Sequence, residues 1–128
     1  ELISYLEKNE KIVLGYERSP LISERATKEH SNISVTTRLP MHNSDAVLCC
    51  EVLEHMERPF ETAIILEALA KNRIILTVPA EDSADKSPYH IWLFEEKDFE
   101  DMFTGKVVSM EVLLTGGNYL TRIVVIDK

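Results

Sequence analysis

The sequence predicts a single α/β domain, a doubly wound and mostly parallel sheet that carries an antiparallel C-terminal strand. Three observations predict it. Short apolar runs typical of strands alternate with helical segments along the chain. The run Ala46–Cys50 is entirely apolar or thiol-bearing, as in a strand buried on both faces of a parallel sheet. Two alternating segments, Lys106–Leu114 and Tyr119–Ile126, close the chain around the hairpin signal of Gly116 and Gly117.

Local patterns predict the elements before the central run. Glu1–Asn9 resembles the end of a helix, and Lys11–Tyr16 is a short apolar strand. Ser19 and Pro20 are typical of a helix start, because serine caps the first amide groups and proline suits the first helical position. The β-branched residues of Asn32–Thr37 then predict a strand near a sheet edge.

The longest predicted helix begins near Pro59 and ends near Asn72. The spacing of its apolar residues predicts a stripe that faces the core, formed by Phe60, Ile64 and Ala68. A second buried strand, Arg73–Val78, follows it directly. Glu95–Phe103 is the last predicted helix, with its aromatic residues on one face.

Composition and charge restrict the possible partners. The chain has 128 residues, of which 45% are hydrophobic and 28% charged, and this suits one globular domain spanning residues 1–128. The formal net charge of −8 argues against nucleic acid as the main partner, because phosphate binding needs clustered lysine and arginine. An apolar run long enough for a transmembrane helix is absent from the sequence, so we expect no membrane partner.

The two cysteines of the chain are adjacent, and their placement indicates the cellular compartment. Cys49 and Cys50 are neighbours in a predicted strand, where their side chains point to opposite faces and cannot pair. We interpret them as buried thiols of a cytoplasmic protein. Because the chain begins at Glu1 without a methionine and inside a predicted helix, we also expect it to be a fragment of a longer protein.

Titratable residues follow the central run at once. Glu51, Glu54 and His55 come directly after Cys50, before the long helix begins. The carboxyl ends of strands in an open α/β sheet are where ligands bind, so this cluster is a candidate site. A charged loop that only caps the next helix is an equally good explanation of the spacing.

Four segments in order carry a resemblance to a known family. Asp45–Pro59 reads D-A-V-x-x-x-E-V-L-E-H-M-x-x-P, which resembles the fourth strand and following loop of class I S-adenosylmethionine-dependent methyltransferases of the type 11 and type 23 groups. Ile12–Ala26 is similar to the second strand and next helix of that family, and Arg73–Pro79 to its fifth strand. Pro88–Phe103 resembles the loop and helix that follow.

The resemblance covers nearly the whole chain and implies a Rossmann-like sheet whose last strand is inserted antiparallel. It also implies two further segments, a first strand and a glycine-rich loop that binds the methionine part of the cofactor. Neither is recognisable in this sequence, so we expect an N-terminally incomplete domain that binds the cofactor more weakly than a chain extended upstream.

The cofactor implied by the resemblance is S-adenosyl-L-methionine. Glu17 ends a strand and is the candidate for the ribose hydroxyls, with Arg18 beside it; a charge that merely flanks the helix is the alternative. Family members often carry an acidic residue before a Leu-Pro pair to bind the adenine amino group. Here Leu39 precedes proline but no acid stands before it, which leaves Thr37 as a weaker donor or acceptor.

Further cofactor contacts are implied where the family's fourth strand passes the cofactor. By position they fall on Cys50, Glu51 and Val52.

His90 is the candidate catalytic residue. Its ordinary pKa suits a general base at neutral pH, whereas packing of the loop over the site is an equally good explanation. Glu51, Glu54 and His55 with His90 also resemble the metal-binding cluster of small-RNA end methyltransferases. The same E-V-L-E-H string occurs in family members without a known metal, so we expect no metal here.

The functional hypothesis is methyl transfer from S-adenosylmethionine to a hydroxyl or carbon atom of a small molecule. A non-catalytic methyltransferase-like binding module is the first alternative, favoured by the missing glycine-rich loop and by the missing acid before Leu39. A metal-dependent RNA methyltransferase is the second, and the negative charge of the chain argues against it.

Overall fold

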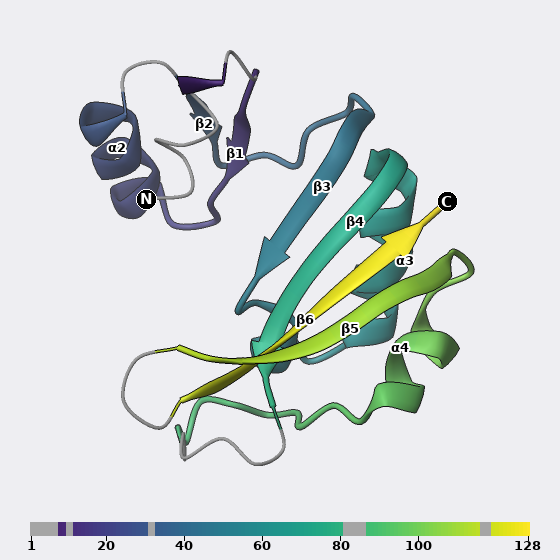
Figure 1. The fold of residues 1–128 in the computed structure, drawn as a ribbon. Helices are drawn as coiled ribbons and strands as arrows, with labels where there is room; N and C mark the ends of the chain where they lie inside the picture. Colours follow the sequence, from purple (N-terminus) through teal and green to yellow (C-terminus); the bar gives the residue numbers. More distant parts are fainter. Residues whose placement is uncertain (1–7, 10–11, 31–32, 81–86, 116–118) are drawn as a thin grey trace. The chain divides into compact units, whose positions relative to one another are not determined.

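The computed structural model describes residues 8–9, 12–30, 33–80, 87–115 and 119–128 (Figure 1). The chain divides into two compact units, Glu1–His42 and Asn43–Lys128, each with a sheet of its own. Elements are labelled as in Figure 1. Most of the predicted helix Glu1–Asn9 and the predicted turn at Gly116 and Gly117 lie outside the described residues.

The first unit is a strand, a helix and a second strand. β1 (Leu14–Tyr16) and β2 (Ser34–Thr36) are parallel, and α2 (Pro20–Glu29) connects them and packs on β2. The helix begins as predicted: Ser19 is its N-cap, and the Ser19 hydroxyl accepts a hydrogen bond from the Ile22 amide at 3.5 Å. Both strands are shorter than predicted.

The second unit is built on a four-stranded sheet in the order β3, β4, β6, β5 (Figure 1). These strands are β3 (Ser44–Cys50), β4 (Ala70–Pro79), β5 (Lys106–Leu114) and β6 (Leu120–Asp127). β3 and β4 are parallel, and β6 is antiparallel to both of its neighbours. The predicted insertion of an antiparallel last strand is therefore confirmed.

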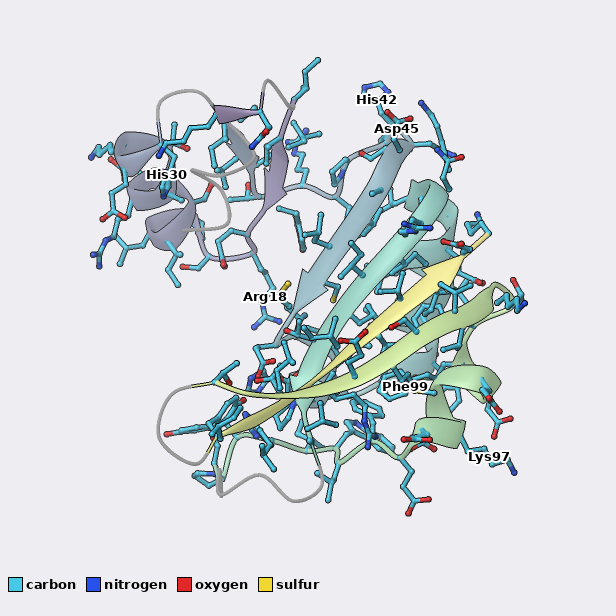
Figure 2. The ribbon with its side chains drawn as sticks, viewed as in Figure 1. Arg18, His30, His42, Asp45, Lys97 and Phe99 are labelled. Atoms are coloured by element: carbon cyan, nitrogen blue, oxygen red, sulfur yellow. The ribbon has the colours of Figure 1, made fainter. Side chains whose placement is uncertain are left out.

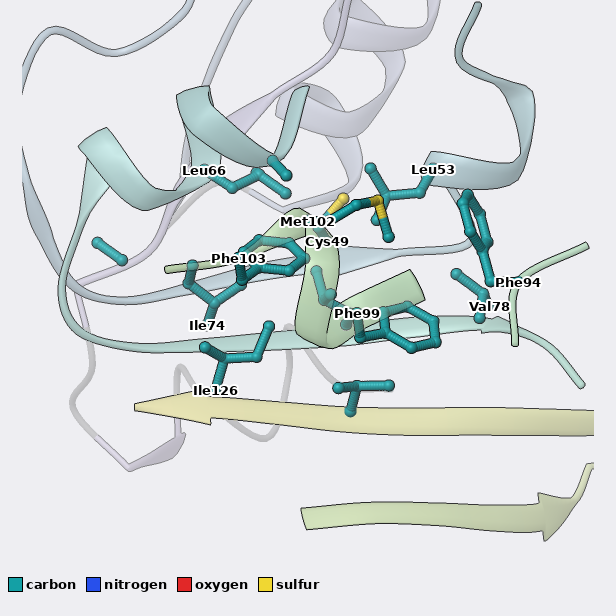
Figure 3. Close-up of a cluster of buried hydrophobic side chains, with 14 residues drawn as sticks. Cys49, Leu53, Leu66, Ile74, Val78, Phe94, Phe99, Met102, Phe103 and Ile126 are labelled. Atoms are coloured by element: carbon teal, nitrogen blue, oxygen red, sulfur yellow. The ribbon is translucent and has the colours of Figure 1, made fainter. Parts of the chain in front are cut away.

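Both helices of this unit cover the same face of its sheet. α3 (Pro59–Leu69) and α4 (Glu96–Met102) contribute to one cluster of buried side chains with Ile74, Leu76 and Val78, which alternate along β4 (Figure 3). On α4, Phe99 is fully buried in this cluster, whereas Lys97 points away from the sheet (Figure 2).

The predicted burial of the central run on both faces is wrong. Cys49 is buried, but Leu48 is 42% exposed, and Ala46 and Cys50 are exposed as well. The reason is that both helices of the second unit pack on the face of the sheet that carries Cys49.

The predicted inward stripe of the long helix is also wrong. Phe60 and Ile64 are 46% and 64% exposed, whereas Ala63 is fully buried and Leu66 faces the cluster (Figure 3). Apolar residues surround this helix on all sides, so their spacing does not select one face.

Among the described residues, no helix combines the length and the apolar character that a membrane crossing needs.

Candidate functional site

The backbone leaves β3 through a strained residue. Glu51 has a φ of 53°, in the left-handed region that non-glycine residues rarely adopt. Its amide still donates to the carbonyl oxygen of Thr77 at 2.8 Å, which extends the pairing of β3 with β4 by one residue. Strain of this kind persists only where surrounding contacts hold it, and such residues cluster at ligand sites.

A tyrosine from the other end of the chain holds the Glu51 side chain. The hydroxyl of Tyr119, the residue before β6, donates to Oε2 of Glu51 at 2.5 Å. The other carboxylate oxygen, Oε1, is buried and has no hydrogen-bond partner within the part of the chain that the structure describes. Glu51 therefore presents an acceptor at the carboxyl end of β3 that a ligand donor would satisfy.

A short 3-10 turn, Leu53–His55, follows Glu51 and fastens the loop that carries His90. Leu53 and Glu54 are fully buried. The Glu54 carbonyl oxygen accepts from the amides of Ile91 and Trp92 at 2.7 and 3.3 Å. These backbone bonds place residues 87–94 against the turn.

The same loop is anchored by its aromatic side chains. The Trp92 indole N–H donates to the Met56 carbonyl oxygen at 2.7 Å. Phe94 is buried beside Trp92 and Phe99, and its carbonyl oxygen accepts from the guanidinium of Arg122 at 2.9 Å. Arg122 itself is only 4% exposed. The loop is therefore tied to the turn and to β6.

Two imidazole rings and a buried carboxylate meet between turn and loop. The rings of His55 and His90 lie edge to face, with centroids 4.8 Å apart and planes at 63°. Nδ1 of His55 is 2.9 Å from the carbonyl oxygen of Tyr89, and its Nε2 is 3.8 Å from Oε1 of Glu54. One ligand atom from each of Glu54, His55 and His90 lies within 4.8 Å of the others.

The thiols beside this site are held in their protonated form. Burial, with the nearby Cys50 and Glu54, raises the pKa of Cys49 to about 12. Burial also raises the pKa of Cys50, although a hydrogen bond with Thr77 acts in the opposite direction. Neither thiol is therefore a ready nucleophile at neutral pH. The prediction of two buried thiols is right for Cys49 and wrong for Cys50, which is exposed.

Predicted site residues of the first unit lie at the carboxyl ends of β1 and β2. The Glu17 amide donates to the Thr36 carbonyl oxygen at 3.0 Å, and Glu17 Oε1 accepts from the Ser19 amide at 2.7 Å. The carboxylate thus supports the N-cap residue of α2. Arg18, Thr37 and Leu39 are exposed, and Arg18 is labelled in Figure 2.

The structure brings together only some of the predicted residues of the second unit. His90 joins Glu54 and His55, but Glu51 stands outside that cluster because Tyr119 holds its carboxylate. Val52 is half-buried and packs against the hydrophobic cluster.

Sequence reasoning missed Tyr119. It lies 68 positions from Glu51, and the two meet only because β6 inserts beside β4.

Comparisons with known proteins identify the fold. No protein-family model and no curated protein sequence matches the chain. Among solved structures, magnesium protoporphyrin IX methyltransferase from Synechocystis PCC 6803 with bound S-adenosylhomocysteine has a TM-score of 0.77 at 17% identity. That match covers 92% of this chain and 64% of the other. The match to a second structure of the same methyltransferase, with bound S-adenosylmethionine, covers 60% of that protein's chain.

Two further solved structures of methyltransferases have the same fold. The N-methyltransferase NodS from Bradyrhizobium japonicum WM9 has a TM-score of 0.72 at 12% identity, over 91% of this chain and 73% of its own. A SAM-dependent methyltransferase from Aquifex aeolicus has a TM-score of 0.70 at 17% identity, and the match covers 97% of this chain and 75% of the other. The chain therefore has the Rossmann-like fold of class I S-adenosylmethionine-dependent methyltransferases, as expected, and spans under two thirds of the magnesium protoporphyrin IX enzyme.

Proposed function

We propose that the chain binds S-adenosyl-L-methionine and takes part in methyl transfer to a small molecule. The observation that carries the proposal is the position of the polar residues in this fold. Glu17 follows β1, Thr37 follows β2 and Glu51 follows β3, so each stands at the carboxyl end of a strand, where open α/β sheets bind ligands. Solved structures with the same fold contain S-adenosylmethionine or S-adenosylhomocysteine.

The residues present are compatible with this cofactor. A carboxylate has about four acceptor positions, and the Ser19 amide uses one of those on Glu17, so hydroxyls of a ribose have acceptors left. Glu51 Oε1 is buried without a partner among the described residues, so a donor group of a ligand would satisfy it. Arg18, Thr37 and Leu39 of the first unit, and Cys50 and Val52 of the second, stay the other cofactor contacts that the family resemblance predicts.

The chemistry divides between cofactor and protein. When bound, S-adenosylmethionine supplies a methyl group activated by its positive sulfur. The chain's residues would hold that methyl group in line with the acceptor atom, and alignment of this kind supplies most of the rate enhancement. The proposed acceptor is a hydroxyl or carbon atom of a small molecule. We further propose that residues 1–128 belong to one methyltransferase-like domain, which acts in the cytoplasm.

In the structure the ring of His90 lies against that of His55 and near Glu54. The general-base role of His90 stays a prediction of the sequence.

A non-catalytic binding module is the alternative function. It is favoured by the absence of an acidic residue before Leu39, where the family often contacts adenine. Binding of S-adenosylhomocysteine without methyl transfer to any acceptor tested would support it.

Thermal unfolding with and without S-adenosylhomocysteine tests the proposed function. A ligand that binds only the folded state at about 100 times its Kd adds about 2.7 kcal/mol to the free energy of unfolding. We therefore expect the midpoint to rise by several degrees with S-adenosylhomocysteine and to stay unchanged with free adenine. An unchanged midpoint at millimolar S-adenosylhomocysteine contradicts the proposal.

A further inference from the structure

We propose that Tyr119 is a positioning residue for cofactor binding and that it acts through Glu51. Its hydroxyl holds Oε2 of the Glu51 carboxylate, so that Oε1 stays directed at a hydrogen-bond donor of the bound S-adenosylmethionine. Tyr119 lies 68 positions from Glu51 along the chain. It has this role only if Glu51 contacts the cofactor, so the inference rests on the proposed function.

The two carboxylate oxygens of Glu51 differ in their contacts. Oε2 accepts from the Tyr119 hydroxyl at 2.5 Å, whereas Oε1 is buried and has no hydrogen-bond partner among the residues that the structure describes. Buried polar groups are almost always paired in native proteins, because an unpaired acceptor costs free energy. Oε1 is therefore the atom of Glu51 that a ligand donor would pair.

Two fixed points determine where Oε1 lies. The first is the Glu51 backbone, whose φ of 53° is left-handed and whose amide donates to the Thr77 carbonyl oxygen at 2.8 Å. The second is the bond from Tyr119 to Oε2. The terminal torsion of a glutamate side chain is broad, so a carboxylate without an anchor rotates through many orientations. With Oε2 held by Tyr119, that rotation is restricted and Oε1 keeps one direction.

Tyr119 is itself held at the base of the β5–β6 pair. Its carbonyl oxygen accepts from the Thr115 amide at 2.8 Å, and the carbonyl oxygen of Leu120 accepts from the Ala80 amide at 2.9 Å. The hydroxyls of Thr115 and Thr121 lie 2.9 Å apart. A tyrosine side chain has only two χ angles, so a fixed backbone leaves its hydroxyl little freedom. A ligand that meets groups already in place loses less entropy on binding.

The chemistry of the carboxylate limits the group that can meet Oε1. An ionised carboxylate only accepts hydrogen bonds, so the ligand must bring an N–H or O–H group. S-adenosylmethionine carries such donors on its ribose, its adenine and its amino-acid part. A hydrogen bond to a charged acceptor is stronger than one between neutral groups. The contact therefore favours a hydroxyl or amino group of the cofactor at Oε1 and disfavours the carboxylate of the cofactor.

Calorimetric titration with S-adenosylhomocysteine in a double-mutant cycle tests the role of Tyr119. The four proteins are the parent, Tyr119→Phe, Glu51→Gly and the double variant. Glycine suits position 51 because it adopts a positive φ without steric cost. Glu51→Met, which has a side chain of similar length without a carboxylate, replaces Glu51→Gly if the glycine variant does not fold.

The expected result is an effect of Tyr119→Phe that depends on Glu51. In the parent background the change should raise the Kd at least about threefold, as expected for two residues coupled in one hydrogen-bond network. In the Glu51→Gly background it should leave the Kd unchanged, because no Glu51 carboxylate is left for Tyr119 to hold. A tyrosine that only supported the fold would weaken binding equally in both backgrounds.

Glu67→Gln is the control for a loss of stability alone. The Glu67 carboxylate accepts from the amides of Thr104 and Gly105, just before β5 begins at the opposite end of the sheet from Glu51. This variant should have a lower free energy of unfolding but the Kd of the parent. Near-ultraviolet circular dichroism verifies that every variant is folded at the temperature of the titration.

The outcomes separate the role of Tyr119 from the proposed function. If S-adenosylhomocysteine does not bind to the parent, the proposed function is wrong and the role of Tyr119 fails with it. If the parent binds and folded Tyr119→Phe has the same Kd, the role of Tyr119 alone is overturned. An equal rise of the Kd in both backgrounds would also overturn it.

Discussion

Glu51 combines a strained backbone with a proposed role in cofactor binding. Its left-handed backbone carries the side chain to Tyr119, and the bond between them joins the end of β3 to the start of β6. The sequence marks Glu51 as a polar residue after an apolar run, and that was sufficient to predict a site there. Neither the strain nor the tyrosine could be predicted, because both depend on the order of strands in the folded sheet.

Removing the Tyr119 hydroxyl should destabilise the protein. In Tyr119→Phe, Oε2 of Glu51 loses its donor in a partly buried position, and we expect the free energy of unfolding to fall by about 1–2 kcal/mol. Tyr89→Phe is the matched control, because Tyr89 is 77% exposed and it is its carbonyl that binds His55. Urea denaturation measures both variants. Equal stability of Tyr119→Phe and the parent would show that the bond is absent in solution.

Cys49 should make stability depend on alkaline pH. Its pKa rises from 9.0 to about 12 on folding, so above pH 9 the unfolded chain loses a proton that the folded chain keeps. The stabilising contribution is therefore complete below pH 9 and is lost as pH rises toward 12. We expect Cys49 to lower the free energy of unfolding by roughly 1.4 kcal/mol per pH unit in this window.

The pH dependence of Cys49→Ala isolates that effect. Lysine and tyrosine residues titrate in the same range in both proteins, so the difference between the two pH curves reports the thiol alone. If the curves run parallel between pH 9 and 12, the Cys49 thiol is not buried as the structure has it.

The bounds of strands and helices were predicted better than the side of each element that is buried. In the part of the second unit that the structure describes, the alternation of apolar and polar segments placed each strand and α-helix within a few residues of its observed bounds, but it did not predict the 3-10 turn Leu53–His55. The prediction of the buried side of α3 was wrong because apolar residues lie on every side of this helix, and only packing against the sheet selects Ala63 and Leu66. The predicted burial of β3 was wrong because the sequence does not say which face of the sheet the helices cover.

Glu67 links α3 to the residues just before β5, and the sequence patterns did not predict this contact. Its buried carboxylate accepts from the amides of Thr104 and Gly105 at 2.8 and 2.9 Å, and from the Thr104 hydroxyl. Glu67→Ala should lower the free energy of unfolding by roughly 2–4 kcal/mol, because partly buried donors lose a charged acceptor. Thermal or urea unfolding provides the measurement.

The control for this change lies on the same helix. Glu61 is exposed and pairs with Arg58, so Glu61→Ala should change the free energy of unfolding by less than about 0.5 kcal/mol. Similar losses in the two glutamate variants would contradict the assigned role of Glu67.

At the scale of the whole molecule, the order of segments predicted the topology, but the distances between side chains could not be predicted. Parallel pairing of β1 with β2 and of β3 with β4, and the antiparallel insertion of β6, agree with the family resemblance. The approach of His90 to Glu54 and His55 depends on backbone bonds between the loop and the turn, which leave no signal in the spacing of residues.

The measurement that tests the central proposal most directly is calorimetric titration of S-adenosylhomocysteine into the parent protein, Glu17→Ala and Glu24→Ala. A ribose held by Glu17 makes two hydrogen bonds to a charged group, each worth about 1.5–3 kcal/mol. We therefore expect binding to the parent, and a Kd at least about tenfold higher in Glu17→Ala. Glu24→Ala should match the parent, because Glu24 is exposed on α2 and pairs with Lys28. No binding to the parent, or equal affinity in all three proteins, would contradict the account.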